Sequence, residues 1–91
     1  MKRVQLLING QVTGVGFRFN LVKIAQDLGI RGWCKNNSTT QVEVIAEGEE
    51  SALKNFITWC QQGPQGAQVS GVTSNWQEAT GEFEGFTAKL G

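Results

Sequence analysis

The sequence contains no histidine, no tyrosine and a single proline among its 91 residues. Without histidine, the protein lacks the side chain that most often serves as a general acid or base near neutral pH, and it cannot form a phosphohistidine. Asp27 is the only aspartate and falls within a helical pattern, so a carboxylate-lined site for two metal ions is hard to build. These absences exclude several common routes by which small enzymes transfer protons or activate water.

The two cysteines, Cys34 and Cys60, restrict the function further. Without histidine, two cysteines cannot complete an ordinary structural zinc site. Neither is followed six residues later by an arginine, so the phosphate loop of the thiol phosphatases is also missing. We interpret both as free thiols in a cytoplasmic protein, and the sequence leaves a disulfide between them as the alternative. We expect no metal ion and no cofactor.

Charge and hydropathy narrow the choice of partners. Eight basic and eight acidic residues cancel, whereas nucleic-acid-binding domains usually have a basic excess. The apolar run near the N-terminus is interrupted by Gln5 and Asn9 and is too short for a signal peptide or a transmembrane helix. With 40% hydrophobic and 18% charged residues, the composition is typical of a folded domain. We expect one domain over residues 1–91, with no nucleic-acid or membrane partner.

The apolar periodicity predicts strands and helices in the order β-α-β-β-α-β, followed by a short terminal strand. Alternation predicts strands over residues 4–8, 31–36, 42–48, 67–76 and 86–90, and helical spacing predicts helices over 17–28 and 49–62. Gly29 and the pair Gly63-Pro64 are typical helix stops. We therefore expect an α+β, ferredoxin-like split β-α-β sandwich, with an antiparallel sheet and two helices on one face. Glu47 is interpreted as part of a solvated face.

The stretch GQVTGVGFR, residues 10–18, is the strongest functional signal. Gly14 and Gly16 allow positive φ and a close approach of the backbone to a ligand, and successive amides there can form a nest for an anion. The helix that follows adds free N–H groups, and the Arg18 guanidinium can hold two phosphoryl oxygens at once. The predicted phosphate-binding loop comprises the backbone of Thr13, Gly14, Val15, Gly16, Phe17 and Arg18. On spacing alone, an ordinary turn with a solvated arginine is the alternative.

The same stretch resembles the signature of the acylphosphatases, Gly-x-Val-Gln-Gly-Val-x-Phe-Arg. A second block of that family, Gly-Trp/Tyr-Val-x-Asn, is similar to GWCKN at residues 32–36. Residues 41–44 resemble the family's next strand, residues 63–69 resemble its Gly-Pro-x-x-Ala-x-Val segment, and Phe86 falls where the family ends on a Gly-Phe strand. The blocks occur in the family order and cover nearly the whole chain.

Three positions depart from the family pattern. Thr13 replaces the signature glutamine, which leaves the side-chain bracing of the loop in question, although a threonine hydroxyl still bonds nearby backbone groups. Cys34 replaces an apolar residue and is interpreted as a small core filler. Thr39-Thr40 replaces the Asp-Gly often found at the hairpin turn, so we expect a looser or differently shaped hairpin.

The resemblance implies that Arg18 binds the phosphoryl group and that Asn36 positions the attacking water. It implies a monomeric enzyme that hydrolyses small acyl phosphates to a carboxylate and inorganic phosphate, the latter also acting as an inhibitor. The residue inventory agrees, because a carboxylate leaving group with a pKa of roughly 4 to 5 needs no proton at neutral pH. An alkoxide leaving from a phosphate monoester would need an acid or a metal ion.

Three other functions are compatible with parts of the sequence. The same loop could hold an anion without turnover, as a binding module. An RNA-binding domain shares the element order, but the strand QVEVIAEG of residues 41–48 has acids and no aromatic residue for base stacking. A small regulatory domain that binds metabolites as a dimer is not excluded, but it gives no reason for Arg18 and Asn36 together.

Overall fold

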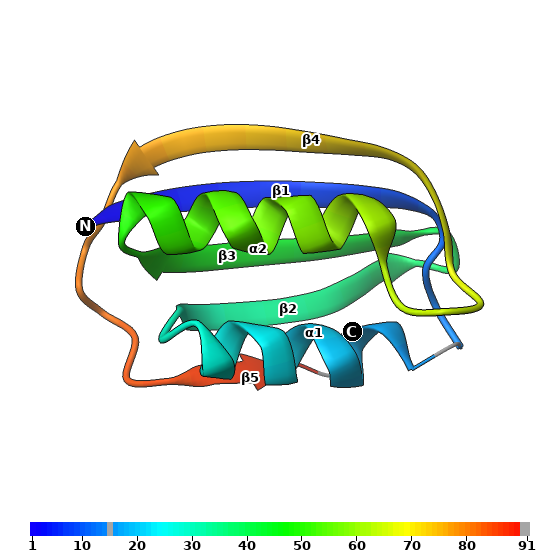
Figure 1. Ribbon diagram of the computed structural model, residues 1–91, viewed down its shortest axis with the longest axis horizontal. Coiled ribbons are helices and arrows are strands. Elements are labelled where there is room, and N and C mark those ends of the chain that lie inside the picture. Colours follow the sequence, from blue (N-terminus) through cyan, green and yellow to red (C-terminus); the bar gives the residue numbers. More distant parts are fainter. Residues whose placement is uncertain (15, 90–91) are drawn as a thin grey trace.

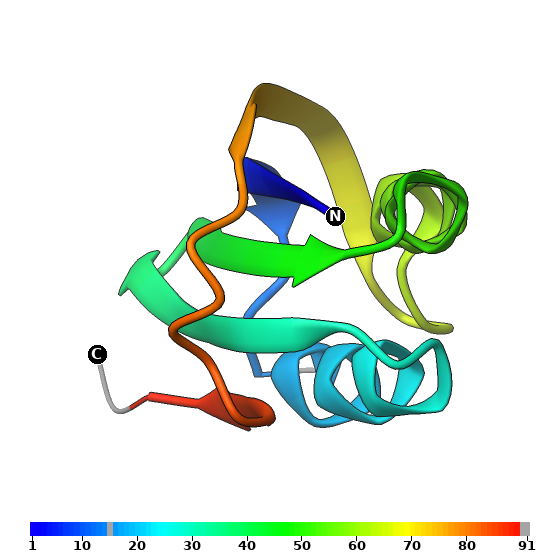
Figure 2. The same cartoon turned by 90° about the vertical axis from the view of Figure 1, so that its left-hand side faces the viewer.

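The computed structural model describes residues 1–14 and 16–89. Its elements are, in chain order, β1 (Lys2–Gln11), α1 (Phe17–Asp27), β2 (Arg31–Ser38), β3 (Gln41–Gly48), α2 (Glu50–Gln62), β4 (Gln68–Glu78) and β5 (Phe86–Ala88). The strands form one sheet in the order β4-β1-β3-β2-β5 (Figure 1). Figure 2 shows that both helices lie on the same face of this sheet. The ferredoxin-like α+β fold predicted from the sequence is thus confirmed.

The sheet is mixed, and the prediction of an antiparallel sheet is wrong for its last strand. β1 pairs antiparallel with β3 and β4, and β3 pairs antiparallel with β2, but β5 lies parallel to β2. The reason is the path of the chain. β4 ends beside Lys2, and the following segment crosses that end of the sheet to the start of β2, so the chain enters β5 in the same direction as β2 (Figure 2). Leu90, which the alternation assigned to this strand, lies outside the described residues.

The core lies between the sheet and the two helices, as the sequence patterns predict. Alternate residues of β1, namely Val4, Leu6 and Ile8, are fully buried. The helix stripes and the facing strand residues complete one cluster, which includes Phe17, Leu21, Ala25, Cys34, Val42, Val44, Leu53, Phe56, Cys60 and Phe86. Both cysteines are buried and free, which confirms the interpretation as thiols. Packing of these side chains supplies the main stabilisation of a domain of this size.

The end of α1 follows the predicted pattern. The N–H of Gly29 donates to Gln26 O at 3.1 Å, and the N–H of Ile30 donates to Ala25 O at 2.9 Å. This pair of bonds defines a Schellman motif, in which the backbone turns away from the helix and satisfies its last carbonyls. The helix therefore ends where β2 has to begin, and this fixes the position of β2 relative to the helix that carries the candidate site.

The interpretation of Glu47 as solvated is wrong, because this residue is only 4% exposed. Its carboxylate accepts hydrogen bonds from Arg3 Nε at 2.7 Å and from the backbone N–H groups of Thr80 at 2.9 Å and Gly81 at 3.0 Å. Burial by itself would raise the pKa of this carboxyl, but the hydrogen bonds from Thr80, Arg3 and Gly81 lower it to about 2. Through its bonds to Thr80 and Gly81, Glu47 holds the segment 79–85 in place where it crosses the end of the sheet (Figure 2).

Replacing Glu47 by glutamine is expected to lower the free energy of unfolding at pH 7 by roughly 2 to 3 kcal/mol, because the neutral amide no longer pairs with Arg3. The folded pKa lies below the ordinary value of 4.5, so the carboxylate contributes its stabilisation above about pH 4.5 and loses it as the pH falls toward about 2. Denaturant unfolding at several pH values should show the two proteins converging over this interval.

The control is Glu78→Gln, since Glu78 pairs with Lys2 at 3.1 Å but its side chain is 85% exposed. That change should cost at most about 0.5 kcal/mol, as is usual for an exposed ion pair. A stability difference between wild type and Glu47→Gln that is the same at pH 2 and pH 7 would contradict the role given to the buried charge.

Candidate active site

The segment between β1 and α1 turns through two glycines. Gly14 and Gly16 have φ values of 76° and 72°, the left-handed conformation expected of them. α1 then begins at Phe17, and no side chain among the described residues caps its first N–H groups. These donors have no partner within the helix either, so they are available to an external acceptor. Val15, which the sequence places in the phosphate-binding loop, lies outside the described residues.

Arg18 lies in the first turn of α1, where acidic residues are favoured by the positive end of the helix dipole. This turn contains no acidic residue, whereas α2 begins with Glu50. A cation at this place is electrostatically unfavourable on its own, because it adds to the partial positive charge of the free N–H groups. A bound anion would be attracted by both, so the local charge distribution favours an anion at the start of α1.

A backbone carbonyl of the C-terminal segment holds the Arg18 side chain. Arg18 Nη1 donates to Lys89 O at 3.1 Å, and the N–H of Lys89 in turn donates to Cys34 O at 2.8 Å. Burial raises the pKa of the Cys34 thiol to about 11, and the positive charge of Arg18 acts in the opposite direction. The two hydrogen bonds place the guanidinium beside β2.

Asn36 lies two residues beyond Cys34 on β2, so the two side chains are on the same, helix-covered face of the sheet. Its Oδ1 atom is buried and accepts no hydrogen bond from the described part of the chain. A buried amide oxygen without a partner is costly, which marks it as an acceptor position for a small donor such as water. The strand pairing shifts between Asn36 and Ser38. Such bulges re-aim the side chains beside them.

The shape of the hairpin after Asn36 explains this shift. Ser38 pairs with Gln41, so Thr39 and Thr40 form a two-residue loop. No non-glycine residue of the described chain has positive φ, and the tightest hairpin turns need positive φ at one or both central positions. Thr39-Thr40 therefore forms a different turn from the one that Asp-Gly favours, and the bulge accommodates it. The expectation of a differently shaped hairpin is confirmed.

Thr13 connects the loop to this hairpin. Its hydroxyl donates to Thr39 O at 2.7 Å, and the N–H of Gly10 donates to Thr40 O at 3.0 Å. Thr13 also lines two neighbouring hollows. The loop hollow, of about 240 Å³, is lined by Val12, Thr13, Gly14, Gly16, Phe17, Arg18 and Phe19. The Asn36 hollow, of about 310 Å³, is lined by Thr13, Asn36, Asn37, Ser38 and Thr39. The two hollows therefore meet at Thr13.

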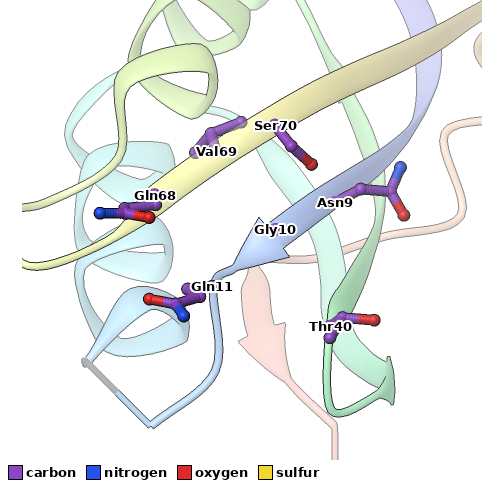
Figure 3. A pocket seen from close by; sticks show the side chains of 7 residues that line it. All are labelled: Asn9, Gly10, Gln11, Thr40, Gln68, Val69 and Ser70. Atoms are coloured by element: carbon purple, nitrogen blue, oxygen red, sulfur yellow. The ribbon is translucent and has the colours of Figure 1, made fainter.

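A larger hollow of about 600 Å³ includes Thr40 of the hairpin loop in its lining (Figure 3). It is lined by Asn9, Gly10, Gln11, Thr40, Gln68, Val69 and Ser70. Figure 3 shows Asn9, Thr40 and Ser70 pointing to one side of β1 and β4, whereas Gln11 and Gln68 point to the other. None of these side chains is charged, so this hollow offers a phosphoryl group no cation. The loop hollow, by contrast, has Arg18 among its lining residues.

The sequence identified the glycines, Arg18 and Asn36, but it did not identify the partners that hold them. The carbonyl of Lys89 lies 71 residues from Arg18, and no local pattern marks a backbone acceptor at that separation. For Thr13, the sequence predicted that the hydroxyl would bond to a nearby backbone group, but it did not predict that this group is Thr39 O. Its partner is set by the hairpin shape, which depends on tertiary packing.

The fold and this geometry define a small α+β domain with a hollow at the glycine-containing turn that precedes its first helix. No helix of residues 1–14 and 16–89 is long and apolar enough to cross a membrane. The same residues contain no group of three or more histidine, cysteine, aspartate or glutamate side chains placed to hold a metal ion together.

Comparison with known proteins identifies the family. The family model for acylphosphatase matches residues 4–88. The acylphosphatase of Roseiflexus sp. (strain RS-1) is 39% identical over 87 residues, which are 96% of this chain and 94% of that protein. The acylphosphatase of Pelotomaculum thermopropionicum is 40% identical over 84 residues, 92% of this chain and 91% of that protein.

A solved structure gives the same result. The crystal structure of acylphosphatase from Bacillus subtilis matches with a TM-score of 0.93 and 28% identity, covering 98% of this chain and 99% of that one. The chain therefore belongs to the acylphosphatase family of hydrolases, and this membership supports acyl phosphate hydrolysis as its reaction.

Proposed function

We propose that this protein hydrolyses small acyl phosphates by attack of water on a phosphoryl group held by Arg18 and the loop amides, with the water oriented by Asn36. The observation that carries the proposal is the shared position of Thr13, which lines both the loop hollow and the Asn36 hollow. A phosphoryl group over the loop and a water molecule on Asn36 would therefore be neighbours. We further propose a monomeric, cytoplasmic enzyme, and the two free thiols suit the cytoplasm.

The phosphoryl group is held mainly by fixed donors. The loop hollow is lined by residues 12–14 and 16–19, and no side chain among the described residues caps the first N–H groups of α1. Arg18 adds a planar cation that can bond two oxygens at once. In phosphoryl transfer, negative charge spreads over the three equatorial oxygens in the transition state. Donors already in place strengthen their contacts at that moment without reorganisation, and this lowers the barrier.

Water is the nucleophile in this mechanism. The buried Oδ1 atom of Asn36 accepts a hydrogen bond from the water and directs an oxygen lone pair toward phosphorus. The water oxygen forms a bond to phosphorus while the bond from phosphorus to the acyl oxygen breaks, and the electron pair of that bond stays on the carboxylate. The proton of the water passes to a phosphoryl oxygen, because the chain contains no histidine to accept it.

The test is the loss of acetyl phosphate or benzoyl phosphate in the presence of the purified protein. We expect turnover that EDTA does not change and that inorganic phosphate inhibits competitively, since phosphate occupies the same loop as the substrate. Binding of phosphate without turnover of either acyl phosphate would show a binding module instead of an enzyme. Turnover that EDTA abolishes would contradict a site built from amides, a guanidinium and a carboxamide.

Thr13→Val tests the connection between the loop and the hairpin. The change keeps the side-chain shape but removes the bond to Thr39 O. We expect the inhibition constant of inorganic phosphate and the KM for acyl phosphate to rise about 3- to 10-fold, because one hydrogen bond contributes about 1 kcal/mol to the order of the loop. Thr13→Ser keeps the hydroxyl and should stay close to wild type. Equal losses in both variants would mean that the methyl group, rather than the hydroxyl, positions the loop.

A further inference from the structure

We propose that a groove between α1 and β5 binds the acyl group of the substrate, while the loop hollow beside it holds the phosphoryl group. The inference rests on the proposed function and adds the class of acyl group to it. The groove has a volume of about 470 Å³ and is lined by Phe19, Val22, Lys23, Gln26 and Ala88. A hollow of this size with mainly apolar walls is typical of sites for small organic groups.

Phe19 is the residue that connects the groove to the loop hollow. It follows Arg18 in the first turn of α1, and it is a lining residue of both hollows. Phe19 is 75% exposed, although the other two phenylalanines of the helices, Phe17 and Phe56, are fully buried. Burial of this exposed aromatic ring, which lies next to a cation in the sequence, against an apolar group of a ligand would be favourable in free energy.

Ala88 also connects the groove to the residue that holds the guanidinium. Ala88 precedes Lys89, whose carbonyl accepts the hydrogen bond from Arg18 Nη1 at 3.1 Å. A ligand with its phosphoryl group on Arg18 therefore has the groove directly beside it.

The order of the three hollows fits the stereochemistry of the reaction. The Asn36 hollow meets the loop hollow at Thr13, and the loop hollow meets the groove at Phe19. In an in-line displacement, the attacking water and the leaving group lie on opposite sides of phosphorus. Because the loop hollow shares a residue with each of the other two, water on Asn36 and an acyl group in the groove would approach the phosphoryl group from different hollows, as this displacement requires.

The lining of the groove indicates an apolar or aromatic acyl group. Phe19, Val22 and Ala88 offer apolar surface, and Lys23 is the one ionisable side chain among the lining residues. A methyl group, as in acetyl phosphate, would fill little of this volume, whereas a phenyl ring reaches Phe19 and Val22. We therefore expect the wild-type protein to have a higher kcat/KM for benzoyl phosphate than for acetyl phosphate.

The experiment measures the ratio of kcat/KM for benzoyl phosphate to that for acetyl phosphate. Phe19→Ala should lower this ratio about tenfold, mainly through a higher KM for benzoyl phosphate, because the ring loses its apolar partner. Phe19→Leu keeps an apolar side chain and should retain most of the ratio. Since Phe19 is 75% exposed, neither change should lower the thermal stability.

The matched control is Trp76→Ala, which removes another exposed aromatic side chain, 40% exposed, from a hollow lined by Lys2, Glu50, Lys54, Gln77 and Glu78. This change should leave the ratio unchanged. Hydrolysis of both substrates with a ratio that Phe19→Ala does not alter would overturn the groove proposal alone. Hydrolysis of neither substrate by the wild type would overturn the proposed function, and the groove proposal would fall with it.

Discussion

Asn36→Ala is expected to lower kcat for acyl phosphate hydrolysis by about 10²- to 10³-fold, while inorganic phosphate binds with nearly its original affinity. The carboxamide contacts the water and not the phosphoryl group in the proposed mechanism, so its loss affects the attack and spares the binding. Removing it also leaves no unpaired buried oxygen on β2, so the variant should fold at least as stably as wild type. Steady-state kinetics and phosphate inhibition of the same preparation give both quantities.

Asn37→Ala is the matched control for this prediction. Asn37 is the next residue on β2, lines the same hollow, and is exposed, with Nδ2 donating to Gln41 Oε1 at 2.9 Å. Because its amide is exposed and already bonds to Gln41, its loss should change kcat less than about threefold. If Asn36→Ala weakened phosphate binding as much as turnover, Asn36 would belong to the phosphoryl site and the assignment of the water would be wrong.

Arg18→Ala is expected to lower kcat/KM by about 10³-fold or more, the range found where an arginine stabilises a phosphoryl transition state. The inhibition constant of inorganic phosphate should rise at least about tenfold, since the charge-assisted bonds to the anion are lost. Unlike Asn36→Ala, this change therefore affects binding and turnover together. Measuring both constants in both variants separates the two roles.

Arg18→Lys and Arg31→Ala complete the comparison. Lysine keeps the positive charge but lacks the planar fork, so most of the activity should stay lost while part of the phosphate affinity returns. Arg31 is an exposed arginine at the start of β2, the end of that strand away from Asn36, and its loss should have little effect. Full activity in Arg18→Lys would mean that charge alone acts at this position and that bidentate binding is not needed.

The sequence was sufficient for features that depend on neighbours along the chain. Gly14 and Gly16 have the expected left-handed backbone because their place between a strand and a helix demands a tight turn. The end of α1 in a Schellman motif was also predictable from the sequence, because it depends only on a glycine followed by an apolar residue, Gly29 and Ile30. Arg18 and Asn36 were predicted from their positions in two short sequence blocks. The structure places the Arg18 guanidinium beside β2, the strand that contains Asn36.

Features that depend on distant segments were not predictable. Glu47 looks solvated in its strand pattern, but the segment 79–85 buries it, and no local signal shows where that segment will cross. The parallel pairing of β5 has the same origin, because it depends on the side of the sheet to which the chain returns. Lys89 contributes through its backbone carbonyl, and side-chain identity carries no information about such a contact.

In the proposed mechanism, the bond from Arg18 to Lys89 O makes the appearance of activity during folding depend on the docking of β5. The guanidinium is fixed only when β5 has joined the edge of the sheet, and β5 is separated from α1 by three strands and a helix along the chain. During refolding, phosphate release should therefore begin after the helical signal has recovered. The rate at which activity appears would therefore measure the docking of the final strand. Circular dichroism and fluorescence report this event only together with the folding of the other elements.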